Sequence, residues 1–260
     1  MVIGWLTEEG ESGGPSSAWA RVEAAQRAVR LPCLLVPQPA HAVLAGELAA
    51  GLVAASFGEL PPEIVRAIQM HDTGWASSDA QQIQRLRSGG AQASHAVPVP
   101  FVAIPPGEVV EAWTASIDSV EAFSKIGAII VSRHFSLLAE HDQAHHQRFL
   151  RTEKSRQQKL ESSAMASGED LERWTAALGF CDLVSLYLVS GLSSEVEFPL
   201  AHPASSQAKT APKARMQIAG RKLYFTPETV RAGCSLSIQA LKHPVPAQGA
   251  RAETLTWEVQ

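Results

Sequence analysis

The stretch Ile64-Val65-Arg66-Ala67-Ile68-Gln69-Met70-His71-Asp72-Thr73-Gly74-Trp75 has the pattern of an amphipathic helix that ends in a tight turn. Ile64, Ile68 and His71 recur at i, i+4 and i+7, which places them on one helical face. A proline pair at 61–62 marks the start, and Gly74 marks the end, where a residue able to adopt positive φ is favoured. His71 and Asp72 thus occupy positions where burial requires compensation, and a metal ion supplies it to both.

Three other predicted helices also carry an ionisable residue toward the interior. A helix beginning at Pro39 has His41 in line with leucines spaced by three and four residues. A helix over 126–140 turns His134 inward, and a helix over 169–190 places Asp182 in the middle of an apolar stripe. We therefore expect several helices to bring titratable side chains together in the core.

The remaining segments complete the predicted fold. We expect a short N-terminal β segment over 1–37, a helical body over 38–200 and a C-terminal β-rich subdomain over 201–260, with Gly220 in a hairpin turn. The body includes a helix over 108–124. Residues 76–107 lack a sustained period, which predicts a long connection, and residues 141–163 predict an exposed helical extension. The fold class expected from this pattern is mainly α.

Composition excludes several classes of protein. The net charge of -4 disfavours binding to a nucleic-acid polymer, and no apolar run is long enough to span a membrane. The three cysteines form no CxxC pair and the N-terminus has no basic, apolar leader, so we expect a reduced, cytoplasmic protein. Oligomeric state, including a homodimer, is left open by the sequence.

Two imidazoles and two carboxylates, from His41, His71, Asp72 and Asp182, suit a divalent ion such as Mn, Fe, Ni, Co or Zn. Their order along the chain, His…His-Asp…Asp on successive helices, resembles the HD superfamily of metal-dependent phosphohydrolases. The resemblance implies an HD-like helical domain in which these four side chains hold the metal.

The wider context resembles more closely an uncharacterised bacterial branch, known only as a domain of unknown function. One departure is Phe135, where that branch tends to have a small residue after its histidine. Neither this departure nor the polar segment around His141 removes a ligand. The matching pieces are Gln38-Pro39-Ala40-His41, His71-Asp72-Thr73-Gly74-Trp75, Ser132-Arg133-His134 and Asp182-Leu183-Val184-Ser185-Leu186-Tyr187-Leu188.

The function expected from these features is metal-dependent hydrolysis of a phosphate ester or anhydride, with a nucleotide among the candidate substrates. Metal-bound water has a lowered pKa and acts as the nucleophile. Asp72 is the candidate to orient or deprotonate that water, and His134 is the candidate to stabilise charge on the phosphoryl oxygens. Trp75 and Asp79 are candidates to line the mouth of the site. The expected partner is a small phosphorylated molecule.

Other interpretations of the same residues stay open. A di-iron HD-like oxygenase would need further ligands, for which His134 is the best candidate. A non-catalytic HD scaffold would bind a nucleotide or a partner protein, and buried polar residues are often only hydrogen-bonded. His141 and His145 have zinc-helix spacing, but their polar surroundings favour a solvated face. Asp118 lies next to the apolar face of the helix over 108–124, and an ion pair with a nearby arginine or lysine is the favoured interpretation.

Overall fold

A computed structural model describes residues 1–5, 17–88, 96–244 and 252–260 of the chain. The protein is 57% helical and has a curled seven-stranded sheet that accounts for 18%. The prediction of a mainly α fold with only small β units is therefore wrong, because the fold is α/β. None of the described helices combines the length and apolar character that a membrane span requires.

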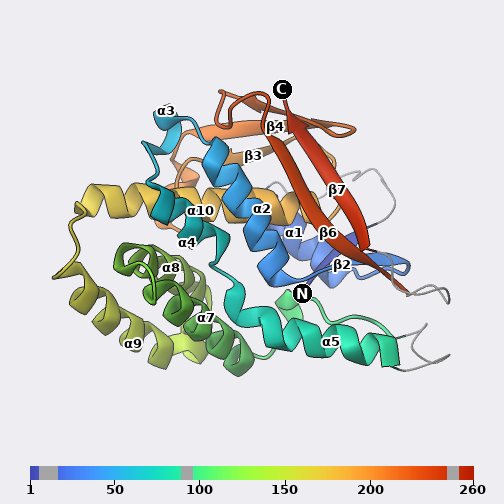
Figure 1. The fold of residues 1–260 in the computed structure, drawn as a ribbon, viewed down its shortest axis with the longest axis horizontal. Helices are drawn as coiled ribbons and strands as arrows, with labels where there is room; N and C mark the ends of the chain where they lie inside the picture. Colours follow the sequence, from blue (N-terminus) through green and yellow to red (C-terminus); the bar gives the residue numbers. More distant parts are fainter. Residues whose placement is uncertain (6–16, 89–95, 245–251) are drawn as a thin grey trace.

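The first and last parts of the chain join in one sheet (Figure 1). All neighbouring strands are antiparallel except β5 and β7, which are parallel. The pairing of β2 with β6, in which Leu35 lies opposite Leu241, connects the N-terminal strands to the C-terminal ones. In spatial order, the strands are β1 (Val2–Trp5), β2 (Cys33–Val36), β6 (Ser235–His243), β7 (Ala252–Val259), β5 (Lys222–Thr226), β4 (Lys213–Ala219) and β3 (Val196–Pro199).

The predicted strands are confirmed. The sequence pattern did not predict which strands pair with one another. The hairpin between β4 and β5 turns at Gly220, whose φ of 62° needs a residue without a Cβ. The strand over 33–36 also forms as predicted. A hydrophobic alternation gives the direction of a strand but not which distant strand completes its hydrogen bonds, so the β segments looked like separate units.

The helices predicted at His41, His71, His134 and Asp182 all form. Figure 1 shows α7, α8 and α9 stacked away from the sheet, with α2 and α10 between them and the strands. The α-helices are α1 (Ala18–Arg27), α2 (Gln38–Gly51), α3 (Ala54–Phe57), α4 (Pro62–Gln69), α5 (Ala76–Ser88), α7 (Pro106–Glu121), α8 (Lys125–Ala139), α9 (Gln143–Glu161) and α10 (Gly168–Val189). Short 3-10 turns are η1 (Thr73–Trp75), η2 (Phe101–Ala103), η3 (Glu140–Asp142) and η4 (Ser206–Lys209).

Helix α10 is the centre of the core. Every residue from 177 to 189 is buried, so this part of the helix is covered on all sides rather than on one stripe. It packs against α2 and α8, and against β1 and β3 of the sheet. Asp182 lies within this fully buried run, where an ionised carboxylate needs partners.

The segment 76–107 was predicted as one long connection, and this prediction is wrong for its first half. Residues 76–88 form α5, while residues 89–95 lie outside the described part of the chain. Helix α5 buries only Asp79 and Leu86. A helix with so little apolar surface gives no clear hydrophobic period, which is why the pattern was missed.

The polar segment after α8 is helical, as predicted, and largely exposed. Helix α9 lies along α8 and buries Phe149, Glu153 and Leu160. Its Arg156 contacts Asp118 of α7 at 2.6 Å, which confirms the predicted ion pair. His141 and His145 are exposed, in agreement with a solvated face.

Candidate metal centre

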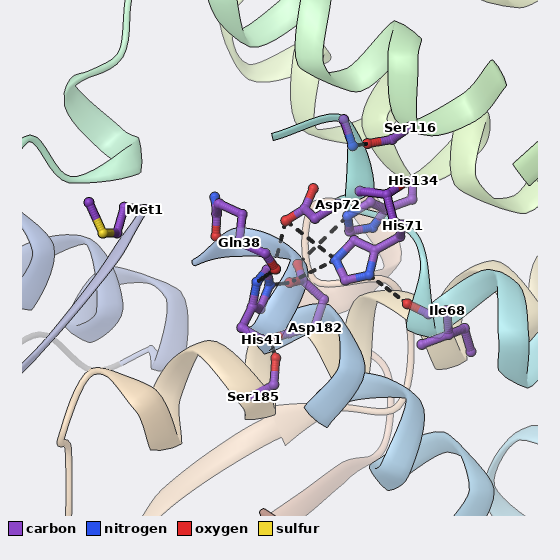
Figure 2. A network of polar contacts seen from close by, with 12 residues as sticks. Met1, Gln38, His41, Ile68, His71, Asp72, Ser116, His134, Asp182 and Ser185 are labelled. Carbon is purple, nitrogen blue, oxygen red and sulfur yellow. Dashed lines mark hydrogen bonds and ion pairs between the residues drawn. The ribbon is translucent and has the colours of Figure 1, made fainter. Parts of the chain in front are cut away.

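Three separate elements bring His41, His71 and Asp182 together in the interior. His41 comes from the first turn of α2, His71 from the turn after α4, and Asp182 from the middle of α10. One nitrogen or oxygen atom from each lies within 4.8 Å of the other two. Figure 2 shows these side chains pointing toward one another, with Asp72 beside them and His134 behind.

Asp72 is the fourth member of the group, and its carboxylate lies near both histidines. Its Oδ2 lies 3.6 Å from His41 Nε2 and 3.7 Å from His71 Nε2. Asp182 Oδ1 lies closer, at 3.0 Å from His41 Nε2 and 3.4 Å from His71 Nε2. The structure thus brings together all four residues for which the sequence predicted a shared ion.

The backbone fixes which nitrogen of each imidazole faces the carboxylates. His41 Nδ1 lies 2.7 Å from the carbonyl oxygen of Gln38, and His71 Nδ1 lies 2.7 Å from that of Ile68. A carbonyl oxygen only accepts hydrogen bonds, so both Nδ1 atoms carry the proton and donate it. A neutral ring therefore presents a bare Nε2 lone pair to the carboxylates. Two lone pairs facing two carboxylates require a positive charge between them, from a proton or a metal ion.

Burial and charge shift the pKa values of this group in opposite directions. Burial lowers the pKa of His71, but the carboxylates of Asp72 and Asp182 outweigh it and raise that pKa to about 9. Burial favours a raised pKa for Asp182, but the hydrogen bond from His41 Nε2 and the charge of the nearby His71 ring hold that pKa far below its usual range. Burial also raises the pKa of Asp72. His71 Nε2 has no hydrogen-bond partner, and this unpaired buried atom fits a metal ligand better than a finished hydrogen-bond network.

Asp79 does not join the centre; it supports the helix that carries His41. Its Oδ2 accepts a 2.6 Å hydrogen bond from the backbone N–H of Gln38, at the first residue of α2. Its Oδ1 lies 3.0 Å from the Met1 amino nitrogen. Asp79 therefore caps α2 across a long sequence distance, whereas the sequence suggested that it lines the mouth of the site. Trp75, by contrast, is buried and lines the cavity described below.

The glycine after the His-Asp dipeptide is needed for packing and not for its φ angle. Positive φ occurs at other described glycines, but not at Gly74, so the expectation of a left-handed helix end is wrong. A Cβ on Gly74 would lie 2.0 Å from the carbonyl oxygen of Ala112 and 2.8 Å from the backbone nitrogen of Ser116. Gly74 also donates its N–H to Ser116 Oγ at 2.9 Å. The turn carrying His71 and Asp72 is thus held directly against α7.

His134 faces the same group and is held by a residue that the sequence did not indicate. The N–H of Ala204 donates to His202 Nδ1 at 3.2 Å, so His202 carries its proton on Nε2. His202 Nε2 then donates to His134 Nδ1 at 2.8 Å, which leaves the His134 proton on Nε2, 3.6 Å from Asp182 Oδ2. Burial lowers the pKa of both rings, that of His202 to about 4, so both are neutral.

His202 follows β3 in a segment without helical or strand periodicity, and no sequence signal marked it. Its position depends on Gly179 of α10, where an added Cβ would lie 2.6 Å from the His202 ring. His134, which the sequence did place inward, is buried. The chain Ala204–His202–His134 makes His134 a hydrogen-bond donor toward the centre rather than a further ligand in its neutral form.

A cavity of about 950 Å³ opens onto this group. Its volume is at the upper end of the roughly 300–1,000 Å³ range of small-molecule sites. The buried part of its lining combines the titratable residues with Trp75, Phe135, Leu183 and Leu186. Its more exposed part carries charged residues from α1, η3, β3, η4 and the start of β4. The centre is therefore accessible to a small molecule.

Fold and site together define an α/β protein with a buried cluster of histidines and aspartates at the end of a deep cavity. The chain belongs to the family described as "Protein of unknown function (DUF3891)", whose sequence model matches residues 27–231. This span contains every residue of the centre, and it bears out the resemblance to an uncharacterised family. Comparison with curated proteins and with solved structures gives no match.

Proposed function

We propose that this protein hydrolyses a phosphate ester or anhydride with a divalent metal ion held by His41, His71, Asp72 and Asp182. The observation that carries the proposal is the pair of buried imidazoles whose Nδ1 protons are fixed on backbone carbonyls. In both neutral rings the Nε2 lone pair therefore faces the carboxylates and is free to bind a cation that lies between them. The order of the four residues along the chain also supports a relationship to the HD superfamily of metal-dependent phosphohydrolases.

When bound at these residues, a divalent ion would supply a Lewis acid that lowers the pKa of water and polarises a phosphoryl oxygen. Asp72, whose pKa is raised by burial, is suited to accept a proton beside the centre. His134 is neutral, and its Nε2–H points toward Asp182 Oδ2, which lies 3.6 Å away. In this proposal the His134 donor stabilises negative charge as it develops on the phosphoryl group.

The arrangement of His134 favours a mononuclear hydrolase over the di-iron alternative. A second iron would need further ligands beyond the first set. His134 accepts a hydrogen bond from His202 at Nδ1, so its Nε2, which faces the centre, carries the proton and has no lone pair for a metal. Among the described residues the cluster with metal-binding spacing consists of His41, His71 and Asp182. A metal-free, non-catalytic scaffold makes a different prediction, namely that the purified protein holds no stoichiometric metal and loses no stability in chelator.

The test is a screen of the purified protein against phosphoesters and nucleotides in the presence of Mn, Fe, Ni, Co or Zn. We expect metal-dependent release of phosphate that is lost in Asp72→Ala. Asp118→Ala is the matched control, because Asp118 is an exposed aspartate that pairs with Arg156 and does not line the cavity. Equal activity of Asp72→Ala and the wild type would contradict the proposed mechanism.

A further inference from the structure

The buried part of the cavity offers an apolar wall next to the metal centre. Phe135 and Trp113 stack with their rings 5.1 Å apart, and both line the cavity. Leu183 and Leu186, one turn apart on α10, extend this surface from Asp182 outward. A substrate that reaches the metal must therefore place a large part of its body against aromatic and aliphatic side chains.

Among the residues that the structure describes, lysines and arginines line only the exposed part of the cavity. The lysines and arginine that line it are Arg27, Lys209 and Lys213, and all three are exposed. Two of them are already neutralised, since Arg27 contacts Glu23 at 2.7 Å and Lys213 contacts Glu197 at 3.2 Å. The cavity therefore has little positive charge to share with a highly charged ligand.

The centre itself also has little charge to spare. The carboxylates of Asp72 and Asp182 balance the charge of a divalent ion. The hydrogen-bond chain through His202 keeps His134 neutral, so it contributes one N–H rather than a positive charge. Enzymes that bind polyphosphates surround them with several cationic or backbone donors. The described residues around this centre provide no such clamp.

Resting on the proposed function, we infer that the substrate is a phosphate ester with a single phosphate group and an apolar or aromatic body, and not a nucleoside polyphosphate. The phosphate group would bind at a metal ion held by His41, His71, Asp72 and Asp182, next to the N–H that His134 turns toward the centre. The body of the molecule lies along Phe135, Leu183 and neighbouring apolar residues, and leads out past the half-buried Val109 toward the exposed rim.

Binding of phosphonates tests this inference without requiring turnover, because their carbon–phosphorus bond is not hydrolysed. The metal-loaded protein is titrated by calorimetry with phenylphosphonate, methylphosphonate and a methylene-bridged ATP analogue. Burial of the phenyl ring predicts that phenylphosphonate binds at least about tenfold more tightly than methylphosphonate. Equal affinity for the two phosphonates, or tightest binding of the ATP analogue, would overturn the inference.

Two valine variants test whether the apolar wall causes the preference for phenylphosphonate over methylphosphonate. Val109→Asp places a charge in the lining, and we expect it to weaken phenylphosphonate binding about tenfold while methylphosphonate binding is unchanged. Val43→Asp is the matched control, because Val43 is 39% exposed on α2 and does not line the cavity. Loss of binding in the control, or none in Val109→Asp, would contradict the assignment; thermal melts verify that both variants fold.

Hydrolysis of phenyl phosphate separates this inference from the proposed function. If phenylphosphonate binds in the expected order and phenyl phosphate is not cleaved with any of the metals, the ligand class stands and the hydrolase proposal fails. If phenyl phosphate is cleaved in a metal-dependent manner but the phosphonates bind without preference, the hydrolase stands and the inferred substrate class fails.

Discussion

Metal binding by this protein is expected to release one proton, and His71 is its source. In the metal-free protein, burial lowers the pKa of His71, but the Asp72 and Asp182 carboxylates outweigh burial and raise the pKa to about 9. At neutral pH the ring is therefore protonated on Nε2, because Nδ1 already donates to the Ile68 carbonyl. A metal ion needs that Nε2 lone pair, so binding must displace the proton.

The size of the effect follows from the same pKa. At pH 7, two units below a pKa of about 9, competition with the proton weakens the apparent metal affinity roughly 100-fold. Below that pKa, the apparent affinity rises roughly tenfold for each unit of pH. The sign is fixed: the charged form of His71 excludes the metal, so raising the pH strengthens binding.

Calorimetric titration with Mn²⁺ measures this release directly. Titrations at pH 7 in PIPES and in Tris, whose ionisation enthalpies differ, give the number of protons released per ion, and we expect one. His145→Ala removes an exposed histidine that pairs with Asp142, and it is expected to behave as the wild type. Binding that releases no proton, with an affinity that stays constant between pH 6.5 and 8.5, would refute the reasoning about His71.

Three further predictions concern stability and turnover. At a free metal concentration near 100 times Kd, we expect a Tm increase of roughly 5–10 °C that Asp182→Asn abolishes, measured by calorimetry. Gly74→Ala is expected to cost roughly 1–3 kcal/mol in urea unfolding because its Cβ meets the Ala112 carbonyl, whereas Gly107→Ala, with open space around it, costs nothing; equal stabilities would contradict the packing role. His202→Ala is expected to lower kcat roughly 100-fold at unchanged metal affinity, and His202→Gln, which can accept from Ala204 and donate to His134, to restore part of it.

The parts of the centre that could be predicted from sequence are those that break a helical pattern. His41 begins an apolar stripe and Asp182 interrupts one in its middle, so the burial of both could be predicted without a structure. His202 lies in an irregular segment after β3, where no period exists for a histidine to interrupt. Its role depends on a contact with His134 of α8, which is 68 residues earlier in the chain.

The fold was predicted least well where long-range pairing or weak burial decides the structure. Helix α5 exposes most of its surface and so has little hydrophobic period, although its Asp79 caps α2. The pairing of β2 with β6 joins strands from opposite ends of the chain, and alternation within each strand does not reveal the partner. Local patterns therefore gave the elements, and tertiary contacts decided that they form one α/β fold.

Anomalous diffraction from crystals grown with Mn²⁺ or Zn²⁺ tests the shared ion most directly. A single anomalous peak is expected among His41 Nε2, His71 Nε2 and Asp182 Oδ1, with metal–ligand distances of roughly 2.0–2.2 Å and with Asp72 beside it. A peak at any other place, or an ordered protein at saturating metal with no peak among these residues, would contradict the account.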